Sequence, residues 1–206
     1  RFGMPLVALT GSSGKTTVKE MLAAILREAC ADESAVLATR GNLNNDIGVP
    51  LTLLELGPGH RYAVVEMGMN HAGEIRTLTR LAAPDVALIN NAGPAHLEFF
   101  GSVEAIARAK GEIFEGLRPG GTAVINRDTP YFNRLSTAAL ATGIGRIVSF
   151  GKHAEADVRI ERAVLHPDCG CITANIICET LIYKLGLPGE HMAVNSLAVL
   201  AAAKLT

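Results

Sequence analysis

The chain has 206 residues, of which 49% are hydrophobic, so it can bury a sizeable core in one large domain or one domain with a small appendage. Its formal net charge of −1 excludes the strongly basic surface of proteins that bind nucleic acid or anionic membranes. The sequence has no signal peptide, no apolar run of ~18 residues and no metal-ligand spacing among its four cysteines, so we expect a cytoplasmic protein with reduced thiols.

Predicted strands and helices alternate along most of the chain. We expect strands at 4–10, 35–39, 62–67, 85–90, 121–126 and 146–150. We expect helices at 15–30, 73–82, 102–117, 129–141 and 189–204. Strands that alternate with helices form right-handed βαβ units, so the predicted fold class is α/β with a mostly parallel sheet flanked by helices.

From residue 157 onward the pattern changes to short strands joined by turns. The expected strands are 158–164, 171–177 and 181–185, with turns at 166–170 and 179–180. We therefore expect a small antiparallel sheet near the C-terminal end, beside the main sheet. The chain starts at Arg1 and ends inside an expected helix, so we also expect it to be part of a longer protein.

The most specific motif is the stretch from Thr10 to Thr17, which reads TGSSGKTT and follows an apolar run. Small residues after a buried strand let backbone N–H groups turn around an anion, and the next helix adds positive charge at its N-terminus. Lys15 is expected to reach the outer phosphates of a nucleotide, and the Thr16 hydroxyl to ligate Mg²⁺. Nucleotide contacts are expected from Gly11, Ser12, Ser13, Gly14, Lys15, Thr16 and Thr17. The alternative is an ordinary strand–turn–helix junction capped by Ser and Thr.

Two polar clusters follow other expected strands, at the edge of an open α/β sheet where ligands gather. The loop 39–50 contains Asn44 and Asn45, which are expected to contact substrate or phosphate, although such Asn and Gly density is also normal for a loop. Glu66 ends a buried strand, where a carboxylate is costly unless it is paired or metal-bound. We expect Glu66 to hold Mg²⁺, with a salt-bridged glutamate as the alternative.

Two further residues have no role that the pattern alone assigns. His96 follows strand 85–90 and could ligate a metal or orient a carboxylate, but a lone loop histidine is more often polar surface. Lys110 lies in the next predicted helix, where composition alone indicates a solvated cation.

Together these motifs resemble those of the Mur ligases over almost the whole chain. The loop matches the family pattern T-G-x-x-G-K-[TS]-[TS], which accounts for its departure from the usual phosphate-loop spacing. The stretches 41–50, 66–75, 95–102 and 109–114 resemble the members that join D-alanyl-D-alanine to UDP-N-acetylmuramoyl-tripeptide. The resemblance implies that residues 1–206 are the central ATP-binding domain of a three-domain enzyme, without its N-terminal UDP-binding domain and its C-terminal domain.

The resemblance also implies which residues hold the cofactors ATP and Mg²⁺. Lys15 and the loop backbone would hold the β- and γ-phosphates of ATP, and Thr16 and Glu66 would ligate the Mg²⁺ that bridges them. His96 would help to hold a second Mg²⁺.

Two more roles follow from the same resemblance. Lys110 matches a lysine that these ligases carbamylate with CO₂, which turns the cation into an anion able to support the second metal site. Asn195 matches an asparagine that contacts adenine, in a motif where Met192 replaces another asparagine of the family.

The implied reaction is ATP-dependent amide formation in peptidoglycan synthesis. A substrate carboxylate attacks the γ-phosphate to give an acyl phosphate and ADP, and the amine of D-alanyl-D-alanine then displaces phosphate. The implied partners are these small-molecule substrates and the flanking domains of the same polypeptide, with neither nucleic acid nor membrane. Two alternatives remain open: a related amide ligase that adds another amino acid, and a P-loop ATPase that drives a protein partner.

Overall fold

The computed structural model describes residues 3–95 and 97–206, so the predicted site residue His96 lies outside the described residues. The strands are β1 (Leu6–Thr10), β2 (Val36–Ala38), β3 (Tyr62–Glu66), β4 (Val86–Ile89), β5 (Thr122–Asn126), β6 (Arg146–Gly151), β7 (Val158–Leu165), β8 (Gly170–Ile176) and β9 (Glu179–Leu185). The helices are α1 (Lys15–Cys30), α2 (Gly48–Leu54), α3 (Glu74–Ala82), α4 (Leu97–Phe100), α5 (Val103–Gly111), α6 (Phe132–Leu140) and α7 (Glu190–Lys204). Two 3₁₀ helices are η1 (Glu33–Ala35) and η2 (Glu112–Gly116).

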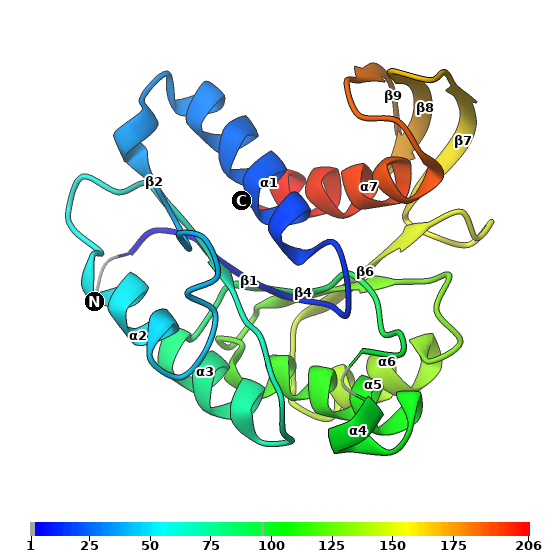
Figure 1. The fold of residues 1–206 in the computed structure, drawn as a ribbon. Helices are drawn as coiled ribbons and strands as arrows, with labels where there is room; N and C mark the ends of the chain where they lie inside the picture. Colours follow the sequence, from blue (N-terminus) through cyan, green and yellow to red (C-terminus); the bar gives the residue numbers. More distant parts are fainter. Residues whose placement is uncertain (1–2, 96) are drawn as a thin grey trace.

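The described strands form one nine-stranded sheet in the order β2-β3-β1-β4-β5-β6-β7-β8-β9. The strands from β2 to β7 pair in parallel, which confirms the predicted α/β class. Helices α1 and α7 cover one face of the sheet, and α2, α3, α5 and α6 cover the other (Figure 1). The first four residues of β1, Leu6 to Leu9, are all apolar because both faces of the strand are buried beneath these helices.

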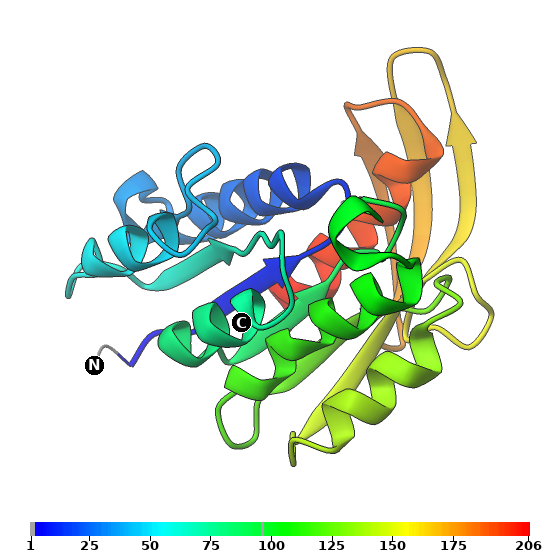
Figure 2. The same ribbon diagram turned by 60° about the horizontal axis from the view of Figure 1, so that its bottom comes forward.

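The expected antiparallel strands are present, and they continue the main sheet. The strand β7 pairs in parallel with the end of β6, at Phe150 and Val158, and then pairs antiparallel with β8. Asp157 holds this junction, because its carboxylate accepts hydrogen bonds from the N–H and the hydroxyl of Ser149 at 2.8 and 2.7 Å. The strands β7, β8 and β9, coloured yellow to orange, extend the sheet at one end (Figure 2).

The structure differs from the predicted elements in two places. One helix begins inside an expected loop, and one expected helix is divided into two. The helix α2 starts inside the expected loop 39–50, where Asn45 accepts hydrogen bonds from the N–H groups of Ile47 and Gly48. The expected helix 102–117 is α5 followed by the tighter helix η2.

None of the helices in the described parts of the chain combines the length and the hydropathy needed to cross a bilayer.

The strand order creates the position of the site. The strand β1 lies between β3 and β4, so the chain leaves it toward β2 and β3 on one side and later returns to β4 on the other. Ligands of open α/β sheets bind in the crevice beyond the carboxyl ends of strands at such a switch point. The carboxyl ends of β1, β3 and β4 carry the residues considered next.

Candidate nucleotide-binding site

The predicted phosphate loop connects β1 to α1. Gly14 has the left-handed φ of 71°, and a Cβ atom there would lie 2.9 Å from the amide nitrogens of Asn90 and Asn195, so the loop requires glycine at this position. The Lys15 side chain folds back over the loop and donates to the Gly11 carbonyl at 2.9 Å. The expected nucleotide contacts therefore lie in this loop and the first turn of α1: Gly11, Ser12, Ser13, Gly14, Lys15, Thr16 and Thr17.

Asn90 and Asn91, directly after β4, hydrogen-bond to the backbone of the phosphate loop. The Asn91 side-chain oxygen accepts from the N–H groups of Ser12 and Ser13 at 2.9 and 3.0 Å. The Asn90 amide donates to the Ser13 carbonyl at 3.1 Å and to the side-chain oxygen of Asn195 at 2.9 Å. The sequence analysis gave these two residues no role, although their place after the strand next to β1 is a usable signal.

Asn195 lies beneath the phosphate loop, in the first half of α7. It is 7% exposed and accepts the hydrogen bond from Asn90. Its amide nitrogen lies 4.0 Å from the thioether of Met192, at the position where the family resemblance implies another asparagine. The last helix of the chain is therefore in direct contact with its first loop.

Glu66, at the end of β3, is 1% exposed and is bound by two neutral groups. One carboxylate oxygen accepts from the Thr16 hydroxyl at 3.1 Å, and the other accepts from the Asn44 amide at 2.7 Å. The ion pairs found among the described residues do not include Glu66. A carboxylate beside a hydroxyl is a hard oxygen donor set, which fits Mg²⁺ with phosphate oxygens as further ligands.

Lys110, on α5, is only 4% exposed, so the expectation of a solvated cation from composition alone is wrong. It lines a pocket of about 170 Å³ together with Gly11, Lys15, Asn44, Asn45, Gly68, Met69, Asn70 and Glu74. Burial, together with the smaller effect of the positive charge of Lys15, lowers the pKa of Lys110 to about 7. The structure thus brings together in this pocket five predicted residues from three separate segments: Gly11, Lys15, Asn44, Asn45 and Lys110.

Lys19 is a residue of the site region that the sequence analysis did not single out. It is fully buried, donates to the carbonyl oxygens of Thr39 and Gly41 at 2.7 and 3.3 Å, and pairs with Glu20 at 3.0 Å. These bonds tie α1 to the start of the loop that carries Asn44. The sequence feature that could have identified Lys19 is its position on the inward-facing stripe of an amphipathic helix, where a lysine needs buried acceptors.

Three comparisons with known proteins agree with this geometry. The family model of the Mur ligase middle domain matches residues 9–203. UDP-N-acetylmuramoyl-tripeptide--D-alanyl-D-alanine ligase from Escherichia coli (strain K12) is 44% identical over 197 residues, which are 95% of this chain and 42% of that protein.

Two solved structures are similar over nearly the whole chain. The crystal structure I of MurF from Acinetobacter baumannii has a TM-score of 0.90 and 40% identity, over 98% of this chain and 42% of that one. MurF ligase from Thermotoga maritima in complex with ADP has a TM-score of 0.84 and 31% identity, over 98% of this chain and 45% of that one. The chain thus spans less than half the length of these relatives.

Proposed function

The chain belongs to the Mur ligase family, and we propose that it is the ATP-binding middle domain of a longer enzyme that joins D-alanyl-D-alanine to UDP-N-acetylmuramoyl-tripeptide. The observation that carries the proposal is the pocket where the phosphate loop meets Lys110, in a chain whose relatives carry that activity in their names. In this proposal the flanking domains bind the rest of the two substrates. Because ATP is a cytoplasmic substrate, we also propose that the enzyme acts in the cytoplasm.

The phosphate loop is the proposed site for the phosphates of ATP. Lys15 would exchange its bond to the Gly11 carbonyl for the β- and γ-phosphates, and the N–H groups of the first turn of α1 would complete the contact. Thr16 and Glu66 would hold the Mg²⁺ that accompanies ATP, because their oxygens already lie 3.1 Å apart. Bound Mg²⁺ supplies positive charge that offsets the charge of the reacting oxygens.

Glu66→Gln is expected to lose Mg²⁺-dependent ATP turnover nearly as fully as Glu66→Ala. The amide keeps the size of the side chain and can still bond to Thr16, but a neutral amide is a poor ligand for a hard dication. The measurement is a Mg²⁺ titration of turnover in the full-length enzyme. Glu55→Gln is the matched control, because Glu55 pairs with Arg40 at the surface. An unchanged titration in Glu66→Gln would identify a purely structural glutamate.

The environment of Lys110 supports carbamylation by CO₂. An ordinary lysine is neutral in about one molecule in 3,000 at pH 7, whereas a pKa of about 7 leaves about half of the molecules neutral. Only the neutral amine can attack the carbon of CO₂, in a step that forms the N–C bond and releases one proton. The resulting anion would replace a buried cation that Lys15 repels. We propose that it supports a second Mg²⁺ together with His96.

In the proposed reaction the residues around the pocket position the substrates and offset their negative charge. The nucleophiles are substrate groups, and no side chain of the protein serves as one. The carboxylate of the peptide attacks the γ-phosphate, ADP leaves, and an acyl phosphate remains. The amine of D-alanyl-D-alanine attacks the acyl carbon, phosphate leaves, and the amine loses a proton. In the first step Lys15 would offset the negative charge of the transferred phosphoryl group, because Lys15 lines the same pocket as Lys110.

The direct test is phosphate release by the full-length protein with UDP-N-acetylmuramoyl-tripeptide, with and without D-alanyl-D-alanine. We expect sustained release only when both substrates are present. Residues 1–206 alone are expected to be inactive in ligation, because orientation of the two substrates supplies roughly 7–11 kcal/mol of barrier reduction and requires the flanking domains. Release with a different amino acid instead would indicate a related amide ligase, and release independent of any carboxylate would indicate a P-loop ATPase.

A further inference from the structure

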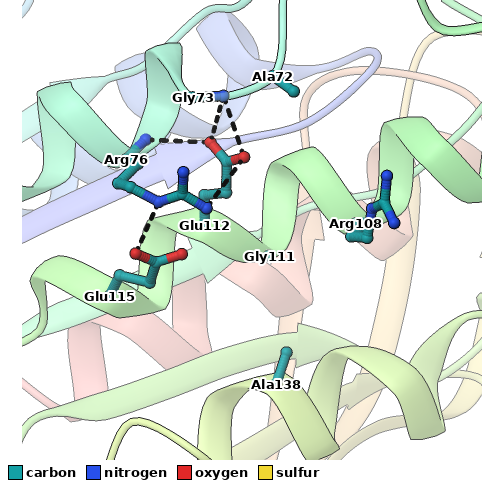
Figure 3. Close-up of a pocket in the computed structure, with 8 residues that line it drawn as sticks. All are labelled: Ala72, Gly73, Arg76, Arg108, Gly111, Glu112, Glu115 and Ala138. Atoms are coloured by element: carbon teal, nitrogen blue, oxygen red, sulfur yellow. Dashed lines mark hydrogen bonds and ion pairs between the residues drawn. The ribbon is translucent and has the colours of Figure 1, made fainter.

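A second and larger pocket lies on the other side of the segment that carries Lys110. Its volume is about 430 Å³, and it lies between α3, α6 and the junction of α5 with η2 (Figure 3). It is lined by Ala72, Gly73, Arg76, Arg108, Gly111, Glu112, Glu115 and Ala138. The feature that matters is the carboxylate of Glu112, which crosses from η2 to the start of α3.

Glu112 caps a helix that has no cap of its own. The N-cap position of α3 is Gly73, which has a φ of 92° and no side chain that could accept a hydrogen bond. Both carboxylate oxygens of Glu112 accept from the Gly73 N–H, at 2.9 and 3.0 Å, and one also accepts from the Arg76 N–H at 3.3 Å. Figure 3 shows these hydrogen bonds of Glu112 to Gly73 and Arg76. The negative charge of the carboxylate also suits the positive end of the helix dipole.

The two segments that Glu112 joins both line the pocket of about 170 Å³ described above, here called the nucleotide pocket, and form two of its walls. Lys110 is two residues before Glu112, so the backbone of one sets the position of the other. The other wall is the segment 68–74, whose members Gly68, Met69, Asn70 and Glu74 line that pocket. Glu112 itself does not line it. The side chain is 9% exposed, and its contacts are with the backbone and guanidinium of the α3 start.

We propose that Glu112 is a positioning residue that sets the register of Lys110 against segment 68–74. It acts through Lys110 and touches neither substrate nor cofactor. The inference rests on the proposed function, because Lys110 matters to catalysis only if the chain carries that activity. A shift of about 1 Å in a catalytic group can cost about 100-fold in rate, so a cap that fixes the relative position of two pocket walls has a measurable effect.

The same helix pair offers a matched control. Glu115, one turn further along η2, pairs with Arg76 at 2.7 Å and with Arg80 at 3.0 Å. The buried Thr79 hydroxyl also donates to the Ile113 carbonyl at 2.7 Å. These contacts hold α3 against η2 without touching Gly73, so Glu115→Gln weakens the same packing and leaves the cap in place.

The experiment compares Glu112→Ala, Glu112→Gln and Glu115→Gln in the full-length enzyme. We expect kcat to fall about 10- to 100-fold in Glu112→Ala, less in Glu112→Gln, which keeps one acceptor oxygen, and hardly at all in Glu115→Gln. The KM for ATP is expected to stay unchanged, because the phosphate loop is intact. Amide hydrogen exchange should accelerate at Gly73 and Arg76 in Glu112→Ala and remain slow in the rest of α3.

Each outcome decides the inference. Equal rate losses in the Glu112 and Glu115 variants, or faster exchange along all of α3, would mean that Glu112 serves only general stability and would overturn it. An unchanged kcat in Glu112→Ala would overturn it as well. The proposed function fails separately, if the wild-type enzyme shows no ligation. In that case the amide hydrogen exchange at Gly73 and Arg76 still decides whether Glu112 holds the start of α3 against the segment that carries Lys110.

Discussion

Lys110→Ala is expected to lower the ligation rate about 100- to 1,000-fold, and added acetate or propionate is expected to restore part of it. The substitution removes the group that we propose becomes a carbamate, and it leaves a space beside Lys15 in a pocket of about 170 Å³. A small carboxylate can enter that space and replace the lost negative charge near the metals. The measurement is the steady-state rate of the full-length variant against acid concentration.

The chemical nature of the rescuing molecule makes this test decisive. If Lys110 acted as a cation, small amines would restore activity and acids would not. If it were a structural residue only, neither would help. Lys204→Ala is the matched control, because that lysine pairs with Glu179 at the surface and its loss should leave the rate and its response to acids unchanged. Rescue by amines alone would refute the carbamate.

Lys15→Ala is expected to reduce ATP turnover to background while the protein remains folded. Its amine makes one hydrogen bond, to the Gly11 carbonyl, so we expect a loss of about 1 kcal/mol in the free energy of unfolding. Its charge, in contrast, is the one that we propose the phosphate loop directs toward the transferred phosphoryl group.

Turnover and thermal unfolding of the full-length variant should be measured together. Normal turnover in Lys15→Ala would show that the loop does not hold the reacting phosphates. Unfolding of the variant would show that the lysine serves the fold. Lys15→Met is the companion variant, because it retains an unbranched apolar stem and removes only the charge.

The parallel part of the fold was predictable from local pattern alone. Runs such as the one that forms β1 are apolar on both faces, and Glu66 stands at a strand end, where a carboxylate needs partners. The continuity of the sheet was not predictable, because it depends on the short parallel pairing of β6 with β7, beside which Asp157 contacts Ser149. Local pattern describes each strand but not which strand it pairs with.

The supporting residues of the site were harder to predict than the residues that they support. Lys19 finds its acceptors 20 and 22 residues away, and Glu112 finds Gly73 at a distance of 39 residues. Composition indicated that Lys110 is solvated, because nothing in its neighbours shows that α5 turns it toward the sheet edge. Only the resemblance to a family suggested a role for it, and burial explains why its chemistry can differ from that of a surface lysine.

The contact of Asn195 with the phosphate loop has a consequence for folding during synthesis. The ribosome makes the loop first, but the helix that supports it from below is made about 180 residues later, which takes about 10 to 35 s at ordinary synthesis rates. During that interval a nascent chain has its glycine loop without its support. On the proposed function, ATP stabilises only chains that can bind it, so we expect it to favour those in which α7 has docked. We therefore expect the nucleotide to stabilise the chain late in folding rather than to act as an early template.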